Sequence, residues 1–190
     1  MRPMAESALI VIGGFAGSGK TLVSKRLAYD MGLPRLEADL LGKTIRELES
    51  FGGTNAQAFQ IGYAILWRLC EEFLSSRTSV IVDANMAWEV AWESVDTVRE
   101  RCPGSTFVPI VLRCPREVCL ERISRRFVEE PGWHGDPERF QDDHATMLWE
   151  YLSKLNRPEA RFVDSNRLAD EVYAEVREHV AATISGGPPP

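Results

Sequence analysis

The 190-residue sequence lacks features that would place it in several special classes. No apolar run approaches the roughly 20 residues of a membrane span, and the apolar stretch 8–12 is too short for a signal peptide. Basic residues are in deficit, because 22 Lys and Arg against 28 Asp and Glu give a formal net charge of −6. Extended nucleic-acid binding needs a broad basic surface, so the composition argues against it. We therefore expect a cytoplasmic domain with no membrane partner.

The cysteines also lack the spacing that is typical of a disulfide framework or a metal site. The four cysteines are Cys70, Cys102, Cys114 and Cys119, and they form no C-x-x-C pair and have no histidine nearby at metal-ligand spacing. Each lies beside apolar residues in a chain with no export signal. The pattern predicts reduced thiols, some of them buried, rather than a structural disulfide or a zinc site.

What the sequence does contain is an alternation of short apolar runs with longer helical patterns. The strand candidates are residues 8–12, 34–38, 80–82, 107–112 and 161–163. Strand–helix alternation of this kind predicts an α/β fold with a mostly parallel five-stranded sheet and helices on both faces, in three layers. Ligands of such sheets bind at the carboxyl ends of the strands.

Three of the helices carry recognisable signals. Thr54-x-x-Gln57 is a capping box, and Pro115 fits the first turn of a later helix. Apolar residues recur every four positions from Leu168 to Ile184, which predicts a final amphipathic helix. We expect one domain over residues 7–184, with an N-terminal extension at 1–6 and a disordered tail at 185–190.

A phosphate-binding loop follows the first strand candidate. Residues Gly14, Phe15, Ala16, Gly17, Ser18, Gly19, Lys20 and Thr21 match G-x-x-x-x-G-K-[ST] in full. The glycines let successive backbone N–H groups turn inward on an anion, and a helix beginning near Lys20 directs its positive end at the same place. Lys20 would neutralise the β- and γ-phosphates, and the Thr21 hydroxyl would ligate Mg²⁺. We expect all eight residues to bind ATP.

The third strand candidate ends in Asp83, which is positioned to hold Mg²⁺. The alternative is an aspartate that caps the following helix. The next residue is Ala84, where ATPase motors usually carry a glutamate that activates water, and the sequence contains no N-K-x-D guanine-binding loop. These two absences fit an enzyme that transfers a phosphoryl group to a hydroxyl acceptor better than they fit a hydrolysis-driven ATPase or a GTPase.

Transfer of this kind needs a carboxylate that orients or deprotonates the acceptor. Asp39 follows the second strand candidate and is our choice, with Arg46 and Asn85 as further acceptor-binding residues. The alternative for Asp39 is a cap of a helix over residues 40–50, and both roles are compatible.

We expect the cations that neutralise the transferred phosphoryl group to lie on the helix that follows Pro115. Arg122 and Arg126 are four residues apart, so like charges would repel there unless an anion joins them. The alternative is a solvated face paired with neighbouring glutamates, which explains Arg125 well and Arg122 poorly. Two glycines and two prolines in residues 129–137 predict a small lid at about 127–138.

Beyond Asp83, Trp88 and Trp92 lie one helical turn apart. An aromatic platform for a substrate ring is one interpretation, and packing in the core is the favoured one. Trp67 and Trp149 lie in apolar helical patterns and are expected in the core.

Together, the segments GFAGSGKT, EAD at 37–39, VIVDAN at 80–85 and CPREVCLERISRR at 114–126 resemble the small P-loop kinases. These include shikimate and gluconate kinases, chloramphenicol phosphotransferase and polynucleotide 5′-hydroxyl kinases. The resemblance covers residues 7–184 and implies the three-layer P-loop fold with a small helical lid. It also implies that Asp39 binds the acceptor or acts as general base, and that Arg122 and Arg126 are lid arginines. Asp164 would lie beside the adenine ring.

We therefore expect an ATP-dependent kinase that uses Mg²⁺ and phosphorylates a hydroxyl group of a small molecule. One alternative is a polynucleotide 5′-hydroxyl kinase, and another is an ATP-binding switch protein with weak ATPase activity. This sequence departs from the family at Glu37, which replaces the first Asp of a D-x-D pair, and at Asn85, which falls one residue early. The acceptor and the oligomeric state are left open.

Overall fold

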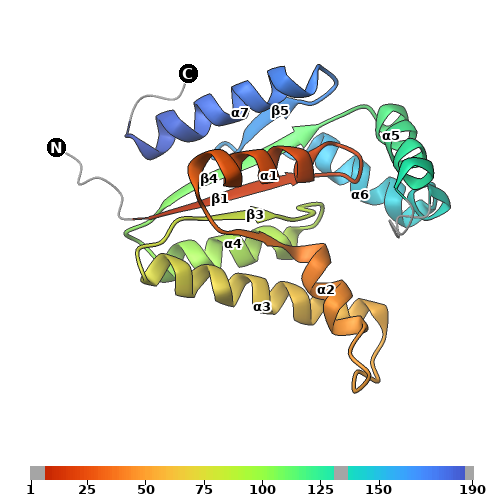
Figure 1. Ribbon diagram of the computed structural model, residues 1–190, viewed down its shortest axis with the longest axis horizontal. Helices are drawn as coiled ribbons and strands as arrows, with labels where there is room; N and C mark the ends of the chain where they lie inside the picture. Colours follow the sequence, from red (N-terminus) through yellow and green to blue (C-terminus); the bar gives the residue numbers. More distant parts are fainter. Residues whose placement is uncertain (1–6, 131–136, 187–190) are drawn as a thin grey trace.

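Five parallel strands form one sheet in the computed structural model, which describes residues 7–130 and 137–186 (Figure 1). The strands are β1 (Ala8–Gly14), β2 (Arg35–Glu37), β3 (Val80–Asp83), β4 (Thr106–Arg113) and β5 (Arg161–Asp164). Their order across the sheet is β2-β3-β1-β4-β5. The crossovers place β1 in the middle, so the loop that follows it lies at the centre of the sheet's carboxyl edge. The predicted α/β class and all five predicted strands are confirmed.

Helices cover both faces of this sheet, which gives the expected three layers. The helices are α1 (Lys20–Met31), α2 (Ala38–Arg46), α3 (Asn55–Ser75), α4 (Glu89–Arg101), α5 (Arg116–Glu129), α6 (Asp143–Lys154) and α7 (Ala169–Ile184), with a 3-10 turn, η1, at Pro137–Phe140. Figure 1 shows α1 and α7 on one face and α3 and α4 on the other, with α2 and α5 beyond the carboxyl ends of the strands.

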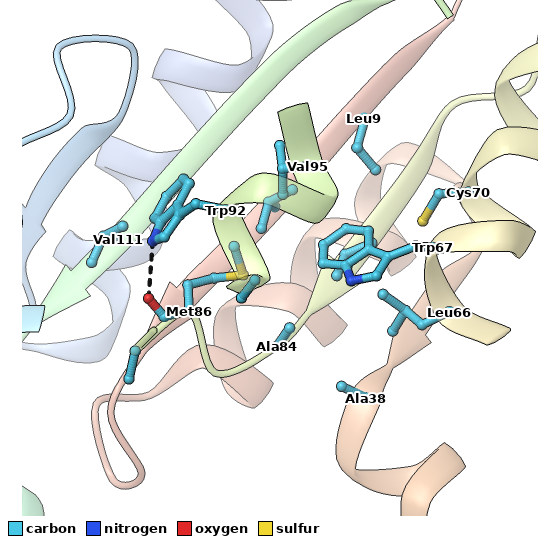
Figure 2. Packing of buried hydrophobic residues seen from close by; sticks show 14 of the residues in the cluster. Leu9, Ala38, Leu66, Trp67, Cys70, Ala84, Met86, Trp92, Val95 and Val111 are labelled. Carbon is cyan, nitrogen blue, oxygen red and sulfur yellow. Dashed lines mark hydrogen bonds between the residues drawn. The ribbon is translucent and has the colours of Figure 1, made fainter. Parts of the chain in front are cut away.

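Side chains of β1 alternate between two hydrophobic cores. Leu9 and Val11 belong to the core under α3 and α4, whereas Ile10 and Ile12 belong to the core under α1 and α7. This alternation explains why the central strands are apolar at every position, since both of their faces are covered. In Figure 2 Trp92 lies in the first of these cores and donates a hydrogen bond from Nε1 to the carbonyl of Met86, 3.0 Å away.

Helix boundaries differ from the sequence predictions in detail. The capping box of Thr54 and Gln57 is confirmed at the start of α3. However, α2 spans Ala38–Arg46 rather than 40–50, because the chain becomes helical immediately after β2. Pro115 is the N-cap of α5 rather than a residue of its first turn. Leu168 is the N-cap of α7 and is 72% exposed, so it does not join the apolar stripe of that helix.

All four cysteines are buried and free, as predicted from their spacing. None of the helices within 7–130 and 137–186 combines the length and apolar character that crossing a bilayer requires. The proposed N-terminal extension (1–6), residues 131–136 of the proposed lid and the last four residues of the proposed tail lie outside the described residues. Within the described part of the lid, residues 127–129 continue α5 and residues 137–138 begin η1.

Candidate active site

The turn between β1 and α1 lies at the carboxyl edge of the sheet (Figure 1). Its residues 17–19 form one wall of a cleft. The cleft has a volume of about 600 Å³ and is lined by the phosphate loop, the start of α1, the second half of α5 and the turn between β5 and α7. A cleft of this size is within the range that holds nucleotides and other small ligands. The phosphate loop thus lies between strand β1 and helix α1, which is the strand–turn–helix context that the motif requires.

Glycines shape the phosphate loop where it meets α5. Gly17 has φ +78°, and a Cβ there would lie 2.4 Å from the carbonyl oxygen of Cys119. Gly19, the N-cap of α1, also has a left-handed backbone with φ +96°. These conformations favour glycine at both positions, although only Gly19 is fixed by the motif and Gly17 stands at a variable position.

Two polar side chains of the loop, those of Lys20 and Ser18, lie at the cleft. The Nζ of Lys20 donates a hydrogen bond to the carbonyl of Phe15 at 3.0 Å, which holds the ammonium over the loop. The Oγ of Ser18 is buried and has no hydrogen-bond partner in the described part of the chain. Both residues line the cleft. A phosphate oxygen there would satisfy a donor that the protein leaves open.

Arg122 bridges two walls of the cleft. It donates to the Gly17 carbonyl at 3.3 Å from Nη1 and to the Ser165 carbonyl at 3.0 Å from Nη2. The half-buried guanidinium thus connects α5, the phosphate loop and the turn after β5. Arg122 therefore lines the cleft rather than a solvated face of α5, and its role toward a phosphoryl group stays a prediction.

Two further arginines of this helix, Arg125 and Arg126, also line the cleft. Arg126 forms an ion pair with Glu130, Nε to Oε2 at 2.8 Å, as the i,i+4 spacing allows. Arg125 was expected to pair with Glu121 or Glu129, but neither pair forms among the described residues. Arg125 is therefore a further cation at the cleft that sequence reasoning assigned to solvent.

Asp39 lies in the first turn of α2, and its backbone is helical; the N-cap is Glu37. Its side chain keeps an exposed face, yet the surrounding protein removes much of its hydration. This loss of hydration is the largest cause that raises the pKa of Asp39. The positive charge of Lys20 opposes the rise, and the negative charges of Asp83 and Glu37 add to it. These influences show that Asp39 shares one electrostatic environment with the phosphate-loop lysine.

Asp83 is only 4% exposed and is held by two neighbours. Its Oδ2 accepts a hydrogen bond from the Ser24 hydroxyl at 3.0 Å and pairs with Nη2 of Arg35 at 2.5 Å. Arg35 also pairs with Glu37 at 2.9 Å, so one guanidinium joins the ends of β2 and β3. The helix after Asp83 has Trp88 as its N-cap, with no side-chain capping bond. The alternative reading of Asp83 as a helix cap is therefore wrong.

Asn85 is near the same edge, and its Oδ1 is buried without a partner in the described chain. The Tyr63 hydroxyl donates to the Asn85 carbonyl at 3.2 Å, and the ring of Tyr63 meets Trp88 edge-on with centroids 6.0 Å apart. Burial is the main cause that raises the pKa of Tyr63, and the charge of Asp39 is the next. Asp39, Tyr63 and Asn85 thus belong to one cluster.

Trp92 lies in the core, as favoured, and forms no platform (Figure 2).

Two predicted site residues are placed less centrally. Arg46 ends α2, seven residues from Asp39 and so near the same face of that helix. The side chain of Asp164 accepts a hydrogen bond from the Asn166 amide at 2.9 Å and lines a second cavity rather than the cleft. The neighbouring residues Ser165 and Arg167 do line the cleft.

Sequence reasoning missed Arg35, Ser24 and Tyr63. Arg35 and Glu37 are two residues apart on a strand, so their side chains lie on the same side of it. Their proximity to Asp83, however, depends on β2 pairing with β3, which the sequence does not reveal. Ser24 is one helical turn after Lys20 and carried no motif. Tyr63 occupied a helical apolar pattern and was indistinguishable from core.

Comparison with known proteins gives consistent results. The chain matches the AAA domain family model over residues 9–148. It is 32% identical over 128 residues to a cytidylate kinase from Methanopyrus kandleri, and this match spans 63% of each chain, less than two thirds of that relative. It is 26% identical over 183 residues to a shikimate kinase from Rhodopseudomonas palustris, covering 91% of this chain and 83% of the relative. The structure of a gluconokinase from Sinorhizobium meliloti has a TM-score of 0.64 at 23% identity, covers 97% of both chains, and shows the shared fold.

Proposed function

The chain belongs to the AAA domain family, and from this premise we propose both that it is a small P-loop kinase and which reaction it catalyses. The reaction is transfer of the γ-phosphoryl group of ATP to a hydroxyl group of a small molecule. The observation that carries this proposal is Asp39, a carboxylate beside the phosphate-loop lysine with its pKa raised from the ordinary value. A carboxylate whose pKa moves toward neutral pH is a stronger base for a hydroxyl proton.

Four cations of the cleft have a role in this proposal. Lys20 neutralises the β- and γ-phosphates once it leaves the Phe15 carbonyl. Arg122 is tied to the loop and to the turn after β5, so it is oriented before the phosphoryl group moves. Arg126 and Arg125 line the same cleft and add positive charge at its rim.

Members of this fold family use Mg²⁺, and the residues present fit it. The described chain contains no cluster of three or more His, Cys, Asp or Glu side chains that would cage a metal. Mg²⁺ at phosphates needs only one or two protein ligands, because phosphate oxygens and water complete its shell. The Thr21 hydroxyl and the Asp83 carboxylate would supply such ligands, since Ser24 and Arg35 both contact Asp83 through Oδ2. When bound, Mg²⁺ would offset the negative charge of the phosphates.

The acceptor would occupy the side of the site that α2 and the segment after β3 form. Asp39 would take its hydroxyl proton, and the unpartnered Oδ1 of Asn85 would accept a second hydrogen bond from it. Arg46 lies farther along α2 and would reach the far end of a larger acceptor. The relatives are named for a nucleotide, a cyclic acid and a sugar acid, so a small-molecule acceptor is the shared expectation.

The test is a screen with γ-labelled ATP against sugars, sugar acids, nucleosides, nucleoside monophosphates, aminoglycosides and oligonucleotides. We expect label to appear on one class of small molecule. Label on an oligonucleotide end would favour the polynucleotide kinase, and release of inorganic phosphate with no labelled acceptor would favour the switch protein. Four free buried thiols fit the cytoplasmic location that we include in the proposal.

A further inference from the structure

Two cysteines meet at the start of α5, directly behind the phosphate loop. Pro115 is the N-cap of this helix, so Cys114 precedes the cap and Cys119 is the fourth helical residue. Side chains at these two positions characteristically pack against each other. Both residues are buried, Cys114 with 8% and Cys119 with 0% exposure. The local geometry therefore brings two thiols together.

The surroundings of Cys114 favour its thiolate. Nη1 of Arg122 lies 3.6 Å from its Sγ. A hydrogen bond from Cys119 is the largest cause that lowers the pKa of Cys114 to about 7; burial opposes it, and the Arg122 charge and Ser165 add to it. The Cys114 thiolate is therefore more favoured than that of an ordinary cysteine. The same pairing raises the pKa of Cys119.

Small molecules can reach Cys114 without entering the nucleotide cleft. It lines a separate cavity of about 400 Å³ between α6 and the ends of β4 and β5, together with Phe15, Trp149 and Phe162. Cys119 does not line this cavity. An oxidant that enters it therefore meets Cys114 first.

We propose that Cys114 is a site of reversible oxidation by hydrogen peroxide, with Cys119 as the thiol that resolves it. The Cys114 thiolate attacks one peroxide oxygen, the O–O bond breaks, and hydroxide leaves, which gives a sulfenic acid at Cys114. The sulfur of Cys119 then displaces the sulfenic oxygen as water, which gives a disulfide between the two residues. Two thiols are oxidised and one peroxide is reduced to two waters.

The disulfide would act on the nucleotide site through two contacts. The Cys119 carbonyl packs against Gly17 so closely that a Cβ there would lie 2.4 Å away, so a shift of this turn displaces the phosphate loop. Arg122 also loses its anionic sulfur partner, which weakens its hold between Gly17 and Ser165. We expect weaker nucleotide binding in the oxidised protein, a consequence that rests on the proposed function.

The chain contains a matched control pair in Cys70 and Cys102. Both are buried, and the two lie near enough that Cys102 influences Cys70. Burial, then the charge of Glu71 and the presence of Cys102, raise the pKa of Cys70 to about 12. With almost no thiolate at neutral pH, Cys70 should resist the same oxidant.

The test is to treat the full chain with hydrogen peroxide near pH 7 and map its cysteines by mass spectrometry. We expect a Cys114–Cys119 disulfide that dithiothreitol reverses, with Cys70 and Cys102 still reduced. In Cys119→Ser, we expect a Cys114 sulfenic acid that dimedone traps. The variants Cys70→Ser and Cys102→Ser should oxidise like the wild type.

Oxidation of Cys70 or Cys102 before Cys114, or conversion of Cys114 to sulfinic acid without a disulfide, would overturn the proposal. Binding of ATP, measured by calorimetry before and after oxidation, should weaken at least about five-fold and recover with dithiothreitol. A disulfide that leaves ATP affinity unchanged would overturn the link to the nucleotide site. The mass readout does not depend on phosphoryl transfer, so failure of this proposal and failure of the proposed reaction are distinguishable.

Discussion

The Nη2 atom of Arg35 lies 2.5 Å from Oδ2 of Asp83, and this contact joins the ends of two neighbouring strands. The same guanidinium pairs with Glu37 at 2.9 Å and donates from Nε to the Ser24 hydroxyl at 2.7 Å. Arg35 therefore fixes the position of a carboxylate that is 4% exposed, and its contact uses only Oδ2 of that carboxylate. We regard Arg35 as the residue that positions Asp83.

Replacement of Arg35 by methionine should destabilise the protein by about 3 kcal/mol, because it leaves a buried carboxylate without its partner. Urea unfolding measures this free energy. The double variant Arg35→Met with Asp83→Asn should be less destabilised than the sum of the single variants. Additive losses would show that the two side chains do not interact in solution.

Replacement of Asp39 by asparagine should lower kcat by about 10²-fold and change ATP affinity by less than about two-fold. The wild-type rate should fall as pH decreases through the raised pKa of Asp39, and this acidic limb should vanish in the variant. Steady-state kinetics across pH measure both effects. Glu47→Gln, at the exposed C-cap of the same helix, is the control and should keep the wild-type profile.

Although Asp39→Asn should lower kcat, it should not lower the stability of the protein. A carboxyl whose pKa is raised by folding binds its proton more tightly in the folded state, so ionisation above that pKa costs stability. Removing the charge should leave Tm unchanged or raise it by about 1–2 °C at neutral pH. A clear decrease in Tm would assign Asp39 a structural role in α2.

Replacement of Arg122 by alanine should reduce phosphoryl transfer by about 10²-fold or more, because no other described side chain joins the Gly17 and Ser165 carbonyls. Arg122→Lys should recover little of this loss, since one ammonium cannot reproduce the planar fork. Arg68→Ala, which removes an exposed arginine paired with Glu71 and Glu72, is the control and should transfer at the wild-type rate.

Replacement of Gly17 by alanine should destabilise the protein by about 2 kcal/mol and weaken ATP binding, because the left-handed backbone and the Cys119 carbonyl leave no room for a Cβ. Gly52→Ala is the matched control, since no atom lies within 4 Å of a Cβ built there. Thermal unfolding and calorimetry separate the two variants. Equal Tm values would contradict the close approach of α5 to the loop.

Local patterns predicted the features of this molecule that depend on short stretches of chain. The phosphate loop, the capping box at Thr54 and the five strands each follow from contiguous residues. The position of Arg122 at the cleft could also be predicted from the sequence. Arg122 and Arg126 would repel each other on one helix face unless an anion lay near them.

Contacts between distant segments could not be predicted in the same way. The pairing of Arg35 with Asp83 depends on β2 lying beside β3, and the contact of Arg122 with Ser165 spans 43 residues. Trp88 and Trp92 have the same spacing in either interpretation, and only the packing assigns Trp92 to the core. Arg125 was assigned to solvent because i,i+4 pairing is a local rule that ignores the neighbouring cleft.

The most direct test of the central claim is to count the γ-phosphoryl groups that reach an acceptor for each ATP consumed, in the wild type and in Lys20→Ala. Phosphorus NMR follows ATP, the phosphomonoester and inorganic phosphate in one sample. The account predicts close to one phosphomonoester per ATP in the wild type and no transfer in the folded variant. Equal turnover in the two proteins, or release of inorganic phosphate alone with every acceptor class, would contradict it.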